Sequence, residues 1–389
     1  MVSERIILCL NVGSSSCKFS LFGDGDRSIA SGEVERIGLS GGSLTICGVD
    51  GARLVEKHRD FKRPRDAITA LFDQFVEARV PEATAVGHRI VHGGPHHIAP
   101  ERVTEELVAD LHRLTPFAPV HMPGAIEGLE AVAERAPKLP QVVCFDTAFH
   151  RHMPPVAERF ALPAKLYDEG VRRYGFHGIS YEYIMTTLGP SRPQRIVIAH
   201  LGNGASMVAV RDGVGIDTTM GLTPTGGFMM GTRSGDLDPS VLMYLMNTRH
   251  LNAAEIERLV DRESGLLGVS AVSSDMRTLL ERRASDPNAA IAVEMFCYQL
   301  RKQIGAFAAA LDGLNLLVFT GGIGEHAAPI RSEVCAGLAH LGIEIDQERN
   351  DAHAELISCD SSSVAARVIA TNENLMIARH TRALVFGVD

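Results

Sequence analysis

The chain has 389 residues, of which 45% are hydrophobic and 22% charged, and its formal net charge is −9. These values are typical of a soluble protein of two domains, and the acidic balance argues against a nucleic-acid partner. No apolar stretch approaches the roughly 20 residues of a membrane-spanning helix, and the run Ile6–Leu10 is too short for a secretory signal. The seven cysteines are scattered without a C-x-x-C pair, so we expect reduced thiols, a cytoplasmic location and no membrane partner.

Residues 6–22 (IILCLNVGSSSCKFSLF) predict a strand, a tight turn and a returning strand. The run Ile6–Leu10 is typical of a buried strand, and residues 11–16 are mostly small turn formers. Such a turn lets backbone N–H groups approach an anion, and Lys18 follows closely, so the stretch favours a phosphate-binding hairpin. An ordinary hairpin with a solvated Lys18 explains it equally well. It is not a Walker A loop, because no Gly precedes Lys18 and no Ser or Thr follows it.

Later in the first half, two charged side chains stand at predicted strand ends. Short alternating segments at 27–61 predict strands that extend the first sheet, and helices are expected at 66–80, 104–114 and 125–135. Arg89 lies in GHRIVHGG, where it could hold a carboxylate or phosphate, although a surface Arg is the plain alternative. Asp146 follows the apolar strand VVCF, at the end where open α/β sheets bind ligands; a turn-forming Asp is the alternative.

The second half contains a similar hairpin pattern, Ile196–Val210 (IVIAHLGNGASMVAV), about 190 residues after the first. This spacing indicates two related domains. His177 lies between an aromatic residue and Gly in RRYGFHGIS, and Arg233 lies in a Gly-rich segment at 217–240 that is too long for a plain connection.

Towards the end, a buried helix is expected from Asp286 to Leu311, and a strand at 314–320. The turn expected after that strand matches a dinucleotide fingerprint, Gly322-x-Gly324-x-x-Ala327. A Gly turn beside an adenosine explains it as well. Glu373 is expected at the end of the last strand.

These motifs resemble the acetokinase family. The matching stretches run in order from residue 11 to residue 379: NVGSSSCK, GHRIVHGG, FDTAFH, RRYGFHG, AHLGNGAS, DTTMGLTP, MMGTRSGDLDP, SSDMR, FTGGIGEH and TNENLMIAR. MMGTRSGDLDP is the most specific. The sequence departs from the family pattern in PVHMP, PTGGF, His326 and Asn374, and the first two leave the acyl-chain preference open.

The resemblance implies an α/β fold of the duplicated actin-like ATPase type (the acetate and sugar kinase/Hsp70/actin fold), with two domains around a nucleotide cleft. Residues 1–150 would form the N-terminal domain, completed by a C-terminal helix at about 375–389, and residues 151–374 would form the C-terminal domain with the nucleotide site. The implied activity is reversible, direct in-line transfer of the γ-phosphate of ATP to acetate with Mg²⁺, or alternatively Mn²⁺, giving acetyl phosphate and ADP. The implied assembly is a homodimer.

By position in the motifs, Arg89 would bind the substrate carboxylate, and His177 and Arg233 would stabilise the transition state. Asp146 stands at the family's catalytic acid/base position. Because a carboxylate substrate is already ionised at pH 7 and needs no base, we expect Asp146 to position Arg89 or Mg²⁺. The implied site residues are Arg89, Asp146, His177 and Arg233 for catalysis; Asn11 and Glu373 for the metal; Arg89, Val91, Val120, Phe176 and Pro224 for acetate; and Lys18, His200, Leu201, Gly202, Asn203, Gly204, Asp275, Met276, Arg277, Gly322, Ile323, Gly324, Glu325 and His326 for ATP.

Three other functions stay open from the sequence. An actin-like filament or scaffold would share the hairpins but would not need Arg89 and Arg233, and a dehydrogenase would depend on the Gly322 fingerprint alone. A propionate kinase, or a kinase of another short-chain fatty acid, is the alternative within the family. Val91, two places after Arg89, favours acetate, because family members that prefer propionate tend to have a smaller residue there.

Overall fold

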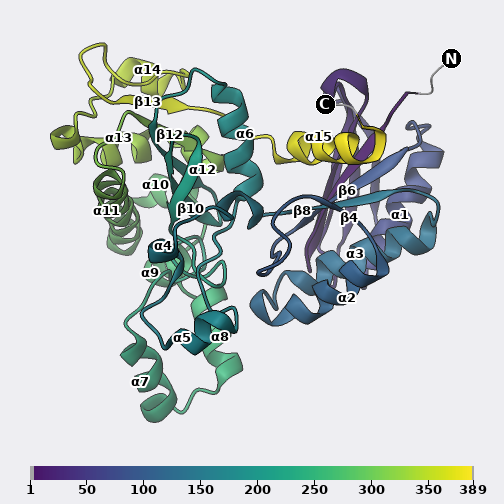
Figure 1. Ribbon diagram of the computed structural model, residues 1–389, viewed down its shortest axis with the longest axis horizontal. Helices are drawn as coiled ribbons and strands as arrows, with labels where there is room; N and C mark the ends of the chain where they lie inside the picture. The colour runs from purple at the N-terminus through teal and green to yellow at the C-terminus, as the bar shows by residue number, and fades with distance from the viewer. Residues whose placement is uncertain (1–3, 388–389) are drawn as a thin grey trace. The chain divides into compact units, whose positions relative to one another are not determined.

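The computed structural model describes residues 4–387, which form two compact units (Figure 1). The first unit contains the described chain up to Phe149 and again from Asn372, and the second runs from His150 to Thr371. Within the described residues, no helix has the length and apolar character needed to cross a membrane.

The first unit is an eight-stranded sheet with helices on both faces (Figure 1). Its elements are β1 (Ile7–Val12), β2 (Ser16–Phe22), η1 (Asp24–Asp26), β3 (Ser28–Glu35), β4 (Ser43–Gly48), β5 (Arg53–His58), α1 (Pro64–Glu77), β6 (Ala85–Ile90), β7 (Glu101–Arg102), α2 (Glu105–Leu114), η2 (Thr115–Phe117), α3 (Met122–Arg135), β8 (Gln141–Phe145), η3 (Ala148–His150) at the first crossing between units, and α15 (Glu373–Phe386).

The strand β1 is buried on both faces, which explains its continuous apolar sequence. Leu8, Leu10 and Val12 belong to the core under α1 and α3. Cys9 points to the opposite face, where its Sγ donates to the backbone oxygen of Asn374 at the start of α15. The last helix of the chain therefore covers the first strand.

The second unit is built on a five-stranded sheet covered by the long helix α11 (Figure 1). Its elements are α4 (Pro155–Glu158), α5 (Ala164–Asp168), α6 (Gly178–Leu188), β9 (Arg195–Leu201), β10 (Ala205–Arg211), β11 (Val214–Thr218), α7 (Pro239–Arg249), α8 (Ala253–Arg262), α9 (Gly265–Ser270), α10 (Met276–Arg282), α11 (Pro287–Ala310), β12 (Leu316–Thr320), α12 (Gly321–His326), α13 (Ala328–Ala336), η4 (Ala339–Leu341), α14 (Gln347–Asp351) and β13 (Ala365–Val368).

The two sheets share one strand order. In the first sheet the order β3-β2-β1-β6-β8 contains two antiparallel and then two parallel pairings. In the second, β11-β10-β9-β12-β13 repeats this order and these directions. Both predicted hairpins, β1–β2 and β9–β10, stand at the same place in this pattern, so the repeat in the sequence corresponds to a repeated fold.

One candidate segment of the second unit differs from the sequence-based expectation. Residues 321–326 were expected as a turn after β12, but they form the short helix α12, with Thr320 as its N-cap residue. Gly321 has a φ of +75°, and a Cβ there would lie 2.8 Å from the backbone oxygen of Leu201. This glycine therefore lets the chain turn from strand into helix directly beside β9.

Candidate active site

In the first unit, three charged candidate residues form one cluster. Arg89 and Asp146 come from the ends of the adjacent parallel strands β6 and β8. The Nε of Arg89 donates to both carboxylate oxygens of Asp146, at 3.0 and 3.1 Å, and its Nη2 donates to Oδ2 at 2.6 Å. The Nη1 of Arg89 lies 3.5 Å from Oε2 of Glu373. Two carboxylates thus orient the guanidinium group.

The cluster is largely shielded from water, since the side chain of Asp146 is 1% exposed and those of Arg89 and Glu373 are each 18% exposed. Burial alone would lower the pKa of Arg89, but the charges of Asp146 and Glu373 and the hydrogen bond with Asp146 outweigh it and raise that pKa. Arg89 therefore stays charged. The expected place of Glu373 was wrong in one respect: it begins α15 instead of ending a strand.

The predicted phosphate hairpin is held from one side by α3. A Cβ on Gly124 would lie 2.8 Å from the carbonyl carbon of Gly13, and a Cβ on Gly128 would lie 2.8 Å from Cγ2 of Val12. The first turns of α3 therefore pack directly on the hairpin turn, which no motif in the sequence indicated. Asn11 pairs with Lys18 across the hairpin, and the Lys18 amine is exposed, 3.9 Å from Glu33.

The metal candidates suit a cation that is shared with a substrate. Mg²⁺ prefers oxygen ligands and usually binds through one or two carboxylates together with substrate phosphates. Asn11 and Glu373 supply oxygen donors of this kind. Among residues 4–387 no group of three His, Cys, Asp or Glu side chains is arranged to hold a metal.

In the second unit, His177 and Arg233 converge over the turn of the β9–β10 hairpin. A Cβ built on Gly204 would lie 3.3 Å from Nη1 of Arg233 and 3.5 Å from Nε2 of His177. Arg233 is further held by a hydrogen bond from Nη1 to the backbone oxygen of Pro224, at 3.2 Å. Two nitrogen groups that can donate to an anion therefore lie beside the same glycine turn.

The hairpin turn itself is packed tightly between two other candidate segments. The backbone N–H of Gly231, two residues before Arg233, donates to the backbone oxygen of Asn203 at 3.0 Å. On the other side, α12 follows β12, the parallel neighbour of β9.

Asp275 is the N-cap residue of α10, because its side chain accepts hydrogen bonds from the N–H groups of Arg277 and Thr278. Hydrogen bonding to Thr278 contributes most to the lowered pKa of Asp275.

Two residues of α12 and α13 have structural contacts that the sequence did not indicate. Oε1 of Glu325, expected at the ATP site, accepts hydrogen bonds from the N–H groups of Gly321 and Thr371, at 2.9 and 3.1 Å. Arg331 is fully buried and donates to the backbone oxygens of Gly324 and Glu325. Glu325 and Arg331 therefore fix the position of α12.

The expected acetate-pocket residues are divided between the units: Val91 and Val120 belong to the first, and Phe176 and Pro224 to the second. Phe176 and Pro224 are buried, while Val91 and Val120 are half-buried.

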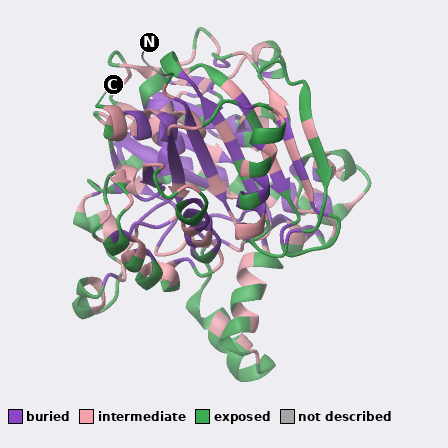
Figure 2. Ribbon diagram, turned by 90° about the vertical axis from the view of Figure 1, so that its right-hand side faces the viewer, coloured by how far each residue is buried: buried purple, intermediate pink, exposed green. Residues whose placement is uncertain are grey.

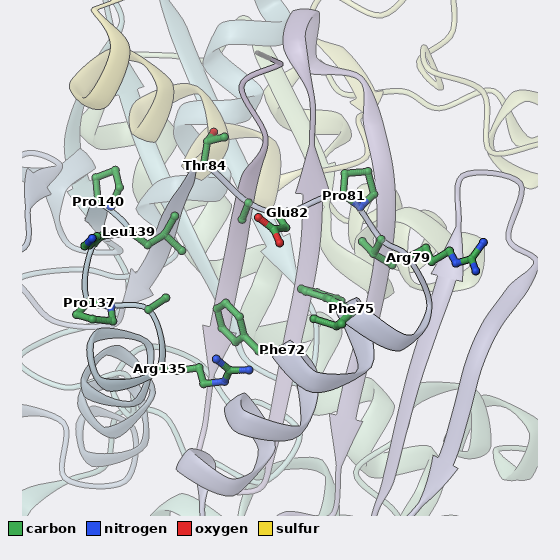
Figure 3. Close-up of a pocket in the computed structure, with 15 residues that line it drawn as sticks. Phe72, Phe75, Arg79, Pro81, Glu82, Thr84, Arg135, Pro137, Leu139 and Pro140 are labelled. Carbon is green, nitrogen blue, oxygen red and sulfur yellow. The ribbon is translucent and has the colours of Figure 1, made fainter.

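A separate groove of about 820 Å³ lies at the ends of α1 and α3, lined by residues that include Phe72, Phe75 and Leu139 (Figure 3). None of its lining residues is a candidate, so the candidate site is defined by its charged clusters.

Comparison with known proteins gives likenesses over nearly the whole chain. The model of the acetokinase family matches residues 6–379. An acetate kinase of Rhodopseudomonas palustris is 45% identical over 396 residues, which cover 98% of this chain and 99% of that protein. Among solved structures, Porphyromonas gingivalis acetate kinase has a TM-score of 0.89 at 38% identity, and a propionate kinase from Francisella tularensis has 0.93 at 36%. Each covers 98% of this chain and 100% of its own.

These likenesses agree with the repeated strand order of the two sheets and confirm the predicted duplicated actin-like α/β fold. They also confirm the resemblance seen in the sequence motifs. The match to this kinase family favours the kinase over the filament and dehydrogenase alternatives. The chain belongs to the acetokinase family.

Proposed function

We propose that the protein catalyses reversible, Mg²⁺-dependent transfer of the γ-phosphate of ATP to acetate, giving acetyl phosphate and ADP. Its family membership makes it a phosphotransferase that acts on acetate. The structural observation that carries the proposal is the convergence of Arg233 and His177 over Gly204, because phosphoryl transfer depends mainly on donors placed around the transferring group.

The proposed step needs no proton transfer. An oxygen of ionised acetate forms a bond to the γ-phosphorus as the bond from that phosphorus to the β–γ bridging oxygen breaks, and the electron pair leaves with ADP. Arg89 would hold the acetate carboxylate, while Arg233 and His177 would donate to the oxygens of the transferring group. Asp146 would keep Arg89 oriented through the contacts already described.

Mg²⁺ belongs to the proposal as a ligand of the nucleotide phosphates, with Asn11 and Glu373 as its protein candidates. When bound, it would neutralise phosphate charge and so reduce the repulsion between ATP and acetate. The nucleotide would be held by the hairpin turn at 202–204, the start of α10 and α12, and Lys18. Mn²⁺ is the alternative metal.

We keep acetate as the preferred acid and propionate as the second candidate, because a propionate kinase is among the structural relatives. The test is hydroxamate trapping of the acyl phosphate, with acetate, propionate and butyrate measured side by side in the presence of MgATP. Acetate should give the highest kcat/KM. No hydroxamate from any of the three acids, in protein that still binds ATP, would overturn the proposal.

The proposal includes a homodimer, and α7 is the surface that supports it. No residue of this helix is buried (Figure 2). Four of its side chains are apolar and yet 41–55% exposed: Val241, Met243, Tyr244 and Met246. An apolar helix left uncovered favours association. Light scattering should give twice the chain mass, and Met243→Glu should shift the protein towards monomer. A parent protein that is monomeric at assay concentration would contradict the dimer.

A further inference from the structure

The imidazole of His177 is held between two different environments. His177 is the N-cap residue of α6, with a φ of +58°, and is only 9% exposed. Its Nδ1 lies 2.8 Å from Oγ of Ser206. Its Nε2 is the ring nitrogen close to Gly204, where Arg233 also ends. One ring nitrogen thus contacts the protein interior, and the other lies in the candidate phosphate site.

Behind Ser206 stands a second hydroxyl group. Oγ of Ser206 is also hydrogen-bonded to the hydroxyl of Tyr181, and both side chains are fully buried. Tyr181 lies one turn after His177 on α6, and Ser206 lies on β10. The ring of His200 stacks on His177 with centroids 4.3 Å apart and planes at 19°. The stacking fixes the plane of the His177 ring, and the hydroxyl chain fixes its rotation within that plane.

The number of available hydrogen atoms determines which group donates and which accepts in each of these hydrogen bonds. A neutral imidazole has one N–H group, and Nε2 must have it in order to donate to a phosphoryl oxygen. Nδ1 is then an acceptor, so the single hydrogen of the Ser206 hydroxyl must point to it. Oγ of Ser206 accepts in turn from Tyr181, so each of the three groups donates towards the phosphate site.

We propose that Ser206 and Tyr181 are positioning residues that hold His177 as the Nε2–H tautomer, with this N–H directed to the side of Arg233. The kinetic part of the inference rests on the proposed kinase function. The tautomer is a property of the folded protein and can be observed without turnover. The role is distinct from catalysis, since both fully buried hydroxyls would act through the ring of His177.

The first test is a nitrogen-15 NMR spectrum of the histidine rings in the full chain at pH 7.5, with the His177 signals assigned by their loss in His177→Asn. The parent should show a protonated Nε2 and an unprotonated Nδ1. Ser206→Ala should mix the two tautomers. An Nδ1–H tautomer or a doubly protonated ring in the parent would overturn the proposal, whether or not the protein is a kinase.

The second test measures whether the effects of two substitutions on kcat are additive in free energy. Ser206→Ala and Tyr181→Phe should each lower kcat about ten- to a hundredfold, as is typical when the partner that orients a reacting group is lost, and should change the KM for ATP and acetate less than about threefold. In a His177→Ala background, Ser206→Ala should cost less than about twofold, because its effect passes through the ring. Losses that multiply in the double variant would contradict the proposal.

Matched controls remove hydroxyls that have other partners in the same unit. Tyr167→Phe deletes a hydroxyl that donates to Glu158, and Ser362→Ala deletes one that donates to the backbone oxygen of Gly342. Both should keep the parental kcat. If Ser206→Ala unfolds, Tyr181→Phe, which keeps the ring and the packing, carries the kinetic test. Inactivity of the folded parent would remove the proposed function and leave the NMR result to decide the tautomer.

Discussion

Replacing Asp146 with Asn tests whether this carboxylate orients Arg89 or accepts a proton. Its two oxygens accept three hydrogen bonds from Arg89. Asn keeps the shape but replaces one oxygen with an amide nitrogen that cannot accept from a guanidinium. Losing hydrogen bonds between charged partners costs about 1.5–3 kcal/mol, which corresponds to about ten- to 150-fold in rate. We expect kcat/KM for acetate to fall by that factor.

The decisive measurement is a double-variant cycle with Arg89→Ala. We expect Arg89→Ala alone to lose at least about a hundredfold in kcat. If Asp146 works through Arg89, adding Asp146→Asn should cost less than about twofold more. If Asp146 is instead a base, the two losses should multiply, and the pH profile of kcat/KM should lose an ionisation in Asp146→Asn.

Asp26→Asn is a matched control for this cycle. Asp26, like Asp146, is a carboxylate paired with arginine in the same unit: Arg379 and Arg382 each lie at 2.8 Å, but Asp26 is not a candidate site residue. It should lower the free energy of unfolding and leave kcat/KM within about twofold. Multiplicative losses in the cycle, with this control behaving as expected, would refute the assignment of Asp146 as a positioning residue.

Gly204→Ala should lower kcat at least about a hundredfold while the protein stays folded, because the methyl group enters the space where Arg233 and His177 converge; Gly305→Ala, where a Cβ meets nothing within 4 Å, should keep the parental rate. Burial lowers the pKa of His88 from its ordinary value near 6.5 to about 4. The unfolded chain therefore takes up this proton at a higher pH than the folded protein does. As the pH falls from 6.5 towards 4, the free energy of unfolding should decrease by about 3 kcal/mol on this account. Urea midpoints between pH 7.5 and 4.5 should fall less steeply in His88→Gln, and an equal slope would exclude His88 as the cause. Val91→Ala should raise kcat/KM for propionate relative to acetate by about tenfold, and an unchanged ratio would remove Val91 from the acetate pocket.

The sequence predicts those parts of the site that depend on local order. Asp146 was expected at the end of a buried strand, and Arg89 ends the neighbouring parallel strand, so ordinary sheet geometry brings them together. The two hairpins were also predictable, because an apolar strand, a run of small residues and a returning strand leave few other foldings for the chain.

The rest depends on contacts between distant segments. Residues 321–326 contain three glycines, which favour a turn, yet they form a helix whose last carbonyls accept hydrogen bonds from the buried Arg331. Ser206 lies 29 positions after His177, and no periodicity in the sequence links them. Side-chain partners of this kind follow from the packed fold, which local propensity does not specify.

The place of α15 has a consequence for synthesis. This helix packs on β1, β6 and β8, and Gly87 on β6 admits it closely, since a Cβ there would lie 2.5 Å from Cγ2 of Ile377. The ribosome makes the whole second unit, more than two hundred residues, before it makes α15. Because translation proceeds at about 5–20 residues per second, one apolar face of the first sheet stays uncovered for roughly ten to forty seconds. During that interval the nascent chain can aggregate through this uncovered face. A chain truncated before residue 373 lacks α15, so the sheet stays uncovered and Arg89 lacks its contact with Glu373.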